Sequence, residues 1–243
     1  MRFLFVLLLT LLIQPAFADK FDKYLEPTSA MMTDYVFDAG LVKIEKDEQV
    51  VEYAALKDCA VYETVRQDMF RQQQMAAQVA AGQADRMKAF NKRMYLRIPG
   101  RLSITRYNFN TQAFDLDDLS KMSNVNVVSI FNLNRGPCND AAIRLFPTSF
   151  AAKLSYPISL RRVPLQADTA QALYDKLPPN PENRRLKALY TDLYITIDGI
   201  MPNMEVSKDG KRVMLMGQID AIDIFTDEYR TKRLKRLDYS ATY

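Results

Sequence analysis

The spacing of apolar residues changes once along this chain, near Tyr95, and this change constrains the fold more than any other feature. From residue 47 to residue 94 apolar side chains recur at steps of three and four, which is the spacing of an amphipathic helix. After Tyr95 short segments alternate between apolar and polar side chains, and this predicts strands, including one at 143–146. The order indicates an α+β fold in which N-terminal helices pack on a largely antiparallel sheet, with a C-terminal β-meander.

The pattern after residue 165 completes this division. A short amphipathic helix with Asp168 near its start is followed by a proline-rich connector at 178–183. Asp209 and Gly210 form a two-residue hairpin signal, because glycine tolerates the positive φ of such turns. We expect a signal peptide at 1–18 and one α+β domain at 19–243, with a helical part at 19–94, strands at 95–165, a helix at 166–177 and the β-meander at 184–243.

Residues 1–18 have the order of parts of a secretory signal peptide. Arg2 provides a positive start, residues 3–13 are apolar, and Ala16 and Ala18 are the small residues that a signal peptidase needs. An apolar run this short spans about half of the hydrocarbon core of a bilayer, so an uncleaved anchor or a buried helix is the weaker alternative. No asparagine stands in an N-x-S/T acceptor, which tilts the interpretation toward a bacterial source. We expect cleavage after Ala18 and a soluble protein in the bacterial periplasm.

The chain has two cysteines, Cys59 on the helical stripe and Cys138 in a loop. In an oxidising compartment such a pair is most economically a disulfide. The closed loop of about 80 residues would stabilise the fold by roughly 4.5 kcal/mol in a chain-entropy model. Two free structural thiols, or one reactive or intermolecular cysteine, are the alternatives.

The absence of histidine removes whole classes of chemistry. A Ser-His-Asp triad, a Cys-His dyad and a Cys/His zinc site cannot form within this chain. There is also no G-x-G-x-x-G motif, no P-loop and no serine-nucleophile motif. With 33 basic and 29 acidic residues the charge is too balanced to indicate a nucleic-acid partner. We therefore expect no cofactor, no metal and no catalytic residue that the sequence can name.

Two groups of carboxylates are the remaining catalytic candidates, since paired acids can hydrolyse glycosides without histidine. The first is Asp115, Asp117 and Asp118, and the second is Asp220 and Asp223. We interpret the first group as turn and cap residues and the second as polar residues on the surface of a strand. A break in the alternation near Asp220 predicts a β-bulge there.

A basic run at 230–236 is a candidate contact to an anionic membrane surface. If the run is a strand, Arg230, Lys232 and Arg236 share one face, and Arg233 and Lys235 share the other. The favoured alternative is an edge strand whose charges prevent edge-to-edge association.

The Met/Ala stripe of the predicted helix indicates core packing, or a surface for a partner. Its second half contains Ala76, Ala80, Ala84 and Met87. Residues 72–74 and Gly82 indicate either a break or an exposed middle, so we expect one long helix or two helices in sequence. The sequence thus favours an exported, non-enzymatic binding or assembly module that meets another envelope protein through helix 47–94. The alternative is a histidine-free hydrolase that uses paired carboxylates, for example on cell-wall glycans.

Overall fold

The computed structural model describes residues 19–47, 49–117, 122–133, 138, 143–201, 205–207 and 210–239. The predicted signal peptide, Asp118 and Asp209 lie outside these residues. The chain is a mixed α+β protein, as the sequence predicts. Its helices are α1 (Ser29–Asp38), α2 (Gln49–Lys57), α3 (Cys59–Val65), α4 (Met69–Ala89) and α5 (Ala167–Tyr174). Its strands are β1 (Met94–Asn108), β2 (Ala113–Leu116), β3 (Met122–Asn132), β4 (Ser149–Leu160), β5 (Arg162–Pro164), β6 (Lys187–Ile200), β7 (Glu205–Ser207), β8 (Gly210–Phe225) and β9 (Arg233–Asp238).

The predicted helical region at 47–94 forms three helices rather than one or two, and its breaks do not fall at residues 72–74 or at Gly82. Asp58 and Asp68 each cap a new helix, accepting hydrogen bonds from the backbone N–H groups of Ala60 and Arg71. Residues 72–74 and Gly82 lie inside α4. An aspartate side chain that satisfies the free N–H groups of a first turn starts a helix more decisively than a gap in the apolar stripe ends one.

The stripe of α4 was expected to pack in the core or to face a partner, and for most of its length core packing is wrong. Only Ala76 and Gln83 of α4 are buried, while Ala80, Ala84 and Met87 are exposed. Gln83 donates from Nε2 to the carbonyl oxygens of Phe37 and Val42, at 3.1 and 2.8 Å. This buried amide fixes which side of the helix faces inward.

The strands form one mixed sheet in the order β3-β4-β8-β6-β1-β2-β5, with β7 and β9 also paired to β8. The contact between β4 and β8 is parallel, and the other strand pairs are antiparallel. Strand β5 continues β4 beyond Arg161, and β3 follows β2 in the chain. Because β2 pairs with β5 and β3 pairs with β4, the two edges of the sheet come together. The N–H of Leu116 donates to the carbonyl of Arg161 at 3.2 Å where they do so.

The sheet therefore curls into a partly open barrel of five strand paths: β1, β2–β3, β4–β5, β6 and β8. The parallel contact joins β4–β5, the third of these in the chain, to β8, the fifth. Helix α5 lies between the third and the fourth. This is the Greek-key order of an OB-type barrel. Alternation along β1 points Leu96, Leu102 and Ile104 into the core and leaves Arg101 and Ser103 outside.

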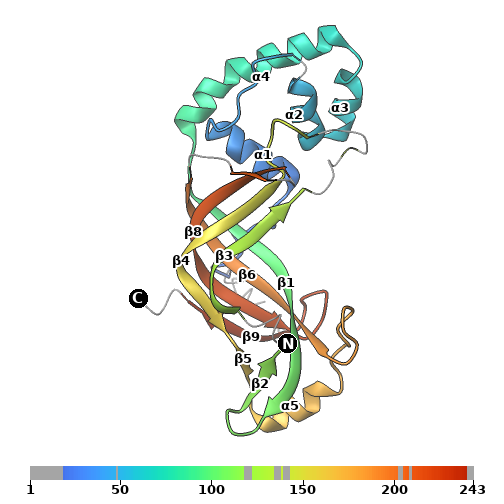
Figure 1. Ribbon diagram of the computed structural model, residues 1–243, viewed down its shortest axis with the longest axis vertical. Helices are drawn as coiled ribbons and strands as arrows, with labels where there is room; N and C mark the ends of the chain where they lie inside the picture. Colours follow the sequence, from blue (N-terminus) through green and yellow to red (C-terminus); the bar gives the residue numbers. More distant parts are fainter. Residues whose placement is uncertain are drawn as a thin grey trace, which may run out of the picture.

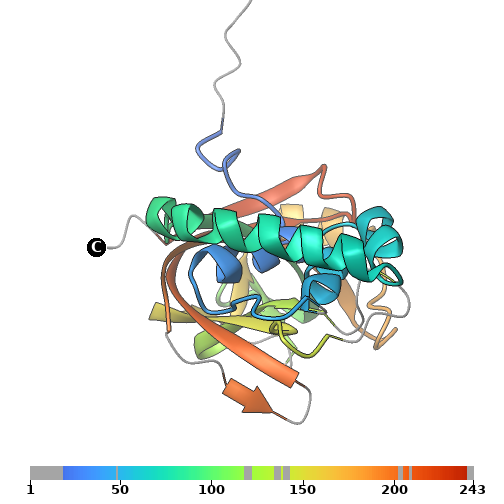
Figure 2. The same cartoon turned by 90° about the horizontal axis from the view of Figure 1, so that it is seen from above.

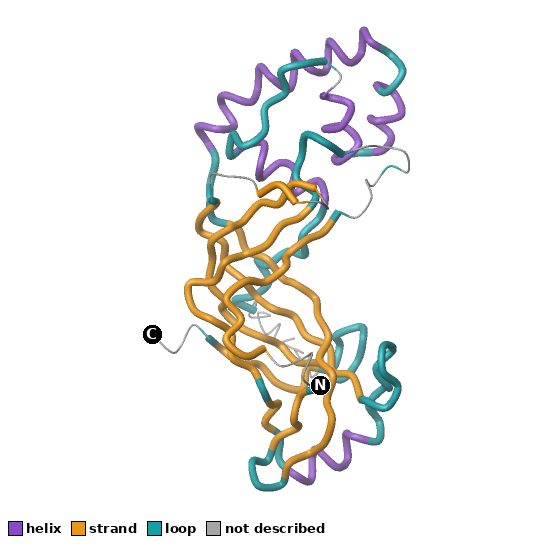
Figure 3. The backbone as a smooth tube through the Cα atoms, in the orientation of Figure 1, coloured by secondary structure: helices purple, strands orange, loops and turns teal. Residues whose placement is uncertain are grey.

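The helices α1–α4 form a layer at one end of the barrel, and α5 lies at the other end (Figure 1). The tube view shows the same division between helical and strand parts (Figure 3). Helix α5 is shorter than the predicted 166–177, and its N-cap position is Gln166, with Asp168 in the first turn.

Residues 143–146, which alternate like a strand, instead form a loop that holds a carboxylate. Glu52 of α2 accepts hydrogen bonds from the N–H groups of Arg144 (2.9 Å), Leu145 (2.8 and 2.9 Å) and Phe146 (2.6 Å). Three consecutive amides aimed at one anion form a backbone nest. Glu52 thus ties the helical layer to the loop that leads into β4.

Strands β6, β8 and β9 follow one another as antiparallel neighbours at the C-terminal end. The register of β6 on β8 slips between Tyr194 and Ile195, which leaves Asp220 as the predicted bulge residue. Strand β7 pairs with the start of β8, where Gly210 has a φ of 117°.

Candidate functional site

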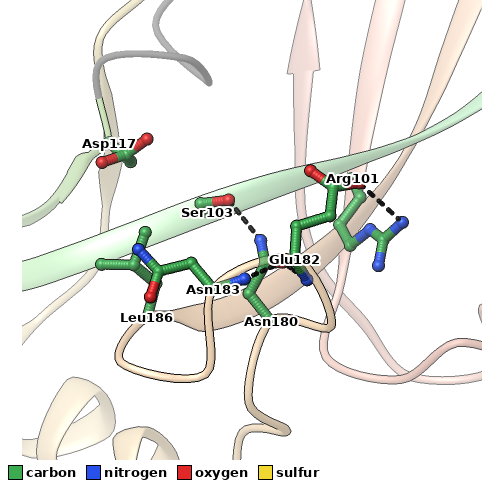
Figure 4. Close-up of a pocket in the computed structure, with 7 residues that line it drawn as sticks. All are labelled: Arg101, Ser103, Asp117, Asn180, Glu182, Asn183 and Leu186. Carbon is green, nitrogen blue, oxygen red and sulfur yellow. Dashed lines mark hydrogen bonds and ion pairs between the residues drawn. The ribbon is translucent and has the colours of Figure 1, made fainter.

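A polar pocket of about 560 Å³ lies between the outer side of β1 and the connector that joins α5 to β6 (Figure 4). Two of its residues come from β1, one follows β2, and the rest come from the connector. The lining residues are Arg101, Ser103, Asp117, Asn180, Glu182, Asn183 and Leu186.

Asn180 organises the pocket. It stands between two prolines, is 3 % exposed, and accepts on its side-chain oxygen the N–H groups of Glu182 (2.8 Å) and Asn183 (3.4 Å). Its Nδ2 donates to the hydroxyl oxygen of Ser103 at 2.5 Å. Its own N–H donates to the carbonyl of Leu186 at 2.8 Å. A stiff segment held by these bonds gives the pocket a preformed wall.

The two carboxylates of the pocket are placed differently. Glu182 lies 3.6 Å from Arg101, and its side chain is 80 % exposed. In Figure 4 Asp117 lies on the far side of Ser103 from Glu182, so the two carboxylates do not point at one another. A general acid for glycoside hydrolysis is normally a shielded carboxyl group, and Glu182 is open to water and paired with a cation.

The first predicted acidic group is divided among different roles. Asp115 lies on β2 and pairs with Arg162 of β5 at 2.9 Å, across the two strands. Asp117 lines the pocket, and Asp118 lies outside the described residues. Asp115 is therefore part of the strand pairing rather than of a turn, and the structure does not bring it into the pocket.

The second acidic group was predicted to lie on the exposed surface of a strand, and this is wrong. Asp220 and Asp223 are 8 % and 1 % exposed. Asp220 accepts hydrogen bonds from the hydroxyl groups of Tyr24 (2.9 Å) and Thr196 (2.6 Å). Asp220 is buried beneath Tyr24 of the N-terminal segment, whereas Asp223 lies against the hydroxyl group of Tyr194 and the guanidinium of Arg236 on β9.

Most of the basic run at 230–236 pairs with buried acids. Arg236 donates two hydrogen bonds of 2.6 Å to Asp223, and this pairing raises the pKa of Arg236. Arg233 lies 3.4 Å from Asp223, and Arg230 lies 2.8 Å from Asp192, which is 2 % exposed. Three of the five candidate cations therefore serve internal ion pairs.

The predicted faces of the basic run also need correction. Strand β9 begins at Arg233, and Arg230 lies before it with a φ of 57°, so Arg230 and Lys232 do not alternate with Arg236. Lys232 is exposed and Lys235 is half-buried. In the described part of the chain β9 pairs with β8 alone, so it lies at an edge of the sheet.

Cys59 and Cys138 are joined as a disulfide, with their Cα atoms 5.3 Å apart. Cys138 is 4 % exposed and packs with Ala54, Ala55, Tyr62 and Val65 of α2 and α3. The pairing predicted from the sequence therefore connects the helical layer to the chain between β3 and β4.

Residues 45–176 match the model of a protein family described as Domain of unknown function (DUF4852), which is more than half of the 243 residues. The chain belongs to this family. No curated protein and no solved structure matches it.

The DUF4852 match ends inside the barrel rather than at its border. It includes α2–α5, both cysteines and the strands β1–β5. The connector with Asn180 and Glu182, and the strands β6 and β8 that complete the barrel, lie beyond it. The matched stretch thus supplies only one wall of the pocket.

Within the described ranges, no three His, Cys, Asp or Glu side chains are grouped as a metal site would need. No helix there is both long and apolar enough to cross a bilayer.

Sequence reasoning missed Arg101, Asn180 and Glu182. The connector at 178–183 was predicted to be stiff. The asparagine between two prolines within it was the one signal that could have indicated the pocket. Its contact with Ser103 joins residues 77 positions apart, and no local pattern contains that contact.

Proposed function

We propose that the protein is an exported, non-enzymatic binding module of the bacterial envelope that holds a hydroxyl-rich ligand, of the class of glycans, in the pocket beside β1. The observation that carries this proposal is the preformed polar lining: one guanidinium, one hydroxyl, two amides and two carboxylates around about 560 Å³. Ligand pockets in proteins commonly fall in this range of volume.

The class of ligand follows from the lining groups. Amide and hydroxyl groups both donate and accept hydrogen bonds, as sugar hydroxyls do. The one cation is partly balanced by Glu182, so a strongly charged ligand has no matched counter-charge. Leu186 supplies a small apolar surface for the face of a ring.

Export rests on the signal pattern at 1–18 and on the disulfide, a bond that persists in oxidising compartments. Mass spectrometry of the protein from its native host should find a mature chain that begins at Asp19. A chain that still begins at Met1 would contradict export.

Calorimetric titration with cell-wall glycan oligomers tests the pocket. We expect binding without turnover, and Arg101→Gln should weaken it about tenfold, the loss expected for one charged contact. Arg97→Gln is the matched control, because Arg97 lies on the same outer side of β1 but lines no part of the pocket. Equal affinities of the two variants, or no binding by the wild type, would refute the pocket as a glycan site.

A histidine-free hydrolase is the second candidate, because Asp117 and Glu182 both line the pocket. If the glycan oligomers are shortened with time, the variants Asp117→Asn and Glu182→Gln distinguish a hydrolase from a binding module. Loss of turnover with retained binding in both would favour the hydrolase over the binding module.

A further inference from the structure

Helix α4 is attached along one side only. Gln72 donates from Nε2 to the carbonyl of Val65 at 2.9 Å. Gln83 donates to one carbonyl in the last turn of α1 and to another after it, and Arg86 pairs with Asp38 at 3.1 Å. Seen from the helical end of the molecule, α4 lies in front of the other elements along its whole length (Figure 2). Its opposite side is therefore open over a helix of 21 residues, about 30 Å long.

The open side of α4 has an ordered composition. With about 100° between successive residues, Phe70, Ala77 and Ala84 lie above one another at heptad spacing. Phe70 and Met69 at the N-terminal end are 83 % and 77 % exposed, whereas Met87 is 41 % exposed and lies against Gly40 on the attached side. A large apolar group at one end and small residues beyond it let a second helix approach closely.

The charges of α4 are arranged around this side. Residues 72–84 include no charged residue, Arg71 precedes them, and Asp85 follows them. The two charges are about four turns apart, so they lie along the same edge of the open side. A parallel second copy would place like charges together, whereas an antiparallel copy places each Arg71 beside the partner's Asp85.

We infer that two copies of this protein associate through α4, antiparallel, about a two-fold axis that passes near the middle of residues 72–84. The surface is self-complementary, as a two-fold interface requires. The Phe70 end of each α4 lies over the Ala84 end of the other copy. The proposed interface lies within the partner surface expected at 47–94 and limits it to Met69–Ala89. The dimer does not depend on the pocket beside β1.

Existing ion pairs do not prevent this arrangement. Arg71 lies 3.1 Å from Asp68 and Asp85 lies 3.5 Å from Lys88, and all four side chains are at least 41 % exposed. Exposed pairs at this spacing contribute little to stability, so the side chains can turn toward a second copy at small cost.

A charge-exchange series, measured by sedimentation velocity on the full mature chain, tests the inference. The wild type should form dimers, and Arg71→Glu or Asp85→Arg alone should weaken the dimer about tenfold or more because like charges then face each other. The double variant Arg71→Glu/Asp85→Arg should restore dimerisation to near the wild-type level. Arg106→Glu, a reversal at an exposed residue of β1, is the control and should change nothing.

Ala77→Glu gives an independent measurement, since it places a charge at the centre of the open side while glutamate remains a good helix former. It should yield monomers with unchanged far-ultraviolet circular dichroism. A wild type that is monomeric at all concentrations would overturn the inference. So would a double variant no better than the single ones. Dimers that survive Ala77→Glu would place the interface elsewhere.

Discussion

Single carboxylates hold parts of this molecule together that lie far apart in the sequence. Glu52 satisfies three backbone N–H groups that a regular strand at 143–146 would have paired with a neighbouring strand. Backbone donors left without a partner cost more free energy than a typical hydrogen bond contributes. The loop before β4 therefore depends on one side chain from α2.

Replacing Glu52 by glutamine should lower the free energy of unfolding by about 2 kcal/mol, because the amide group offers one acceptor oxygen where the carboxylate offers two. Urea unfolding followed by circular dichroism measures this. Glu63→Gln is the control, because Glu63 is exposed and pairs with Arg66 three residues away at the end of α3, so its loss should cost about 0.5 kcal/mol or less. Similar costs for both variants would contradict a special role for Glu52.

Asp192 illustrates a second kind of acid, one that is buried beside a single close cation. Burial raises the pKa of Asp192 above its usual 3.8, and Arg230 at 2.8 Å opposes that shift. The folded state therefore binds the proton more tightly than the unfolded chain does. The resulting contribution to stability is present below pH 3.8 and is lost as the pH rises through the folded-state pKa.

A carbon NMR titration of the Asp192 carboxyl group should find a pKa above 3.8 in the wild type. In Arg230→Gln the pKa should rise further, because the nearest opposing charge is gone. Lys235→Gln, a change elsewhere in the basic run, should leave the pKa of Asp192 unchanged. A lower pKa in Arg230→Gln would mean that Arg230 does not act on this group.

At the scale of elements, close approach of backbones decides where side chains are tolerated. A Cβ atom on Gly217 of β8 would lie 2.5 Å from the backbone oxygen of Thr196 on β6, and backbone cannot move aside cheaply. A Cβ on Gly82 of α4 would meet nothing closer than 3.7 Å. The same substitution should therefore have opposite effects in the two elements.

Gly217→Ala should lower the free energy of unfolding by about 2 kcal/mol or more through overpacking. Gly82→Ala should raise it by about 1 kcal/mol, because alanine favours the helix interior. Thermal unfolding of the two variants in one buffer measures the contrast. If both changes act in the same direction, the strand contact is less tight than described.

The elements also show what the sequence could reveal. The change of period at Tyr95 located the border between helices and strands, and the slip near Asp220 located a bulge, because both are local patterns. The burial of Asp220 depends on Tyr24, which comes from the other end of the chain, and the burial of Asp223 depends on Arg236 of the next strand, so alternation alone indicated a surface position for both. The pocket could not be predicted for the same reason, because Asn180 and Ser103 come into contact only in the folded barrel.

On the scale of the whole molecule, the disulfide and Glu52 fasten the same connection between β3 and β4 to the helical layer. The peptide chain itself joins the two parts through the residues between α4 and β1. The predicted extent of a single domain, 19–243, stays a prediction.

Replacing Cys59 and Cys138 together by serine should lower the free energy of unfolding by up to about 4 kcal/mol, the chain-entropy value for so large a loop. A reducing agent should lower the stability of the wild type by a similar amount and leave the double variant unaffected. Urea unfolding with and without the reductant measures both effects. A wild type indifferent to the reductant would contradict a stabilising bridge.

The first and last described segments lie against each other. Nζ of Lys20 is 3.3 Å from the carboxylate of Asp238, and Arg236 lies 3.0 Å from Asp19, across a separation of 217 residues. If the chain is exported with its N-terminus first, residues 19–25 reach the folding compartment at the start and their partners on β8 and β9 at the end. Contacts between them then form only after the last strand has arrived, and contacts between residues so far apart in the sequence slow the folding of a chain of this size.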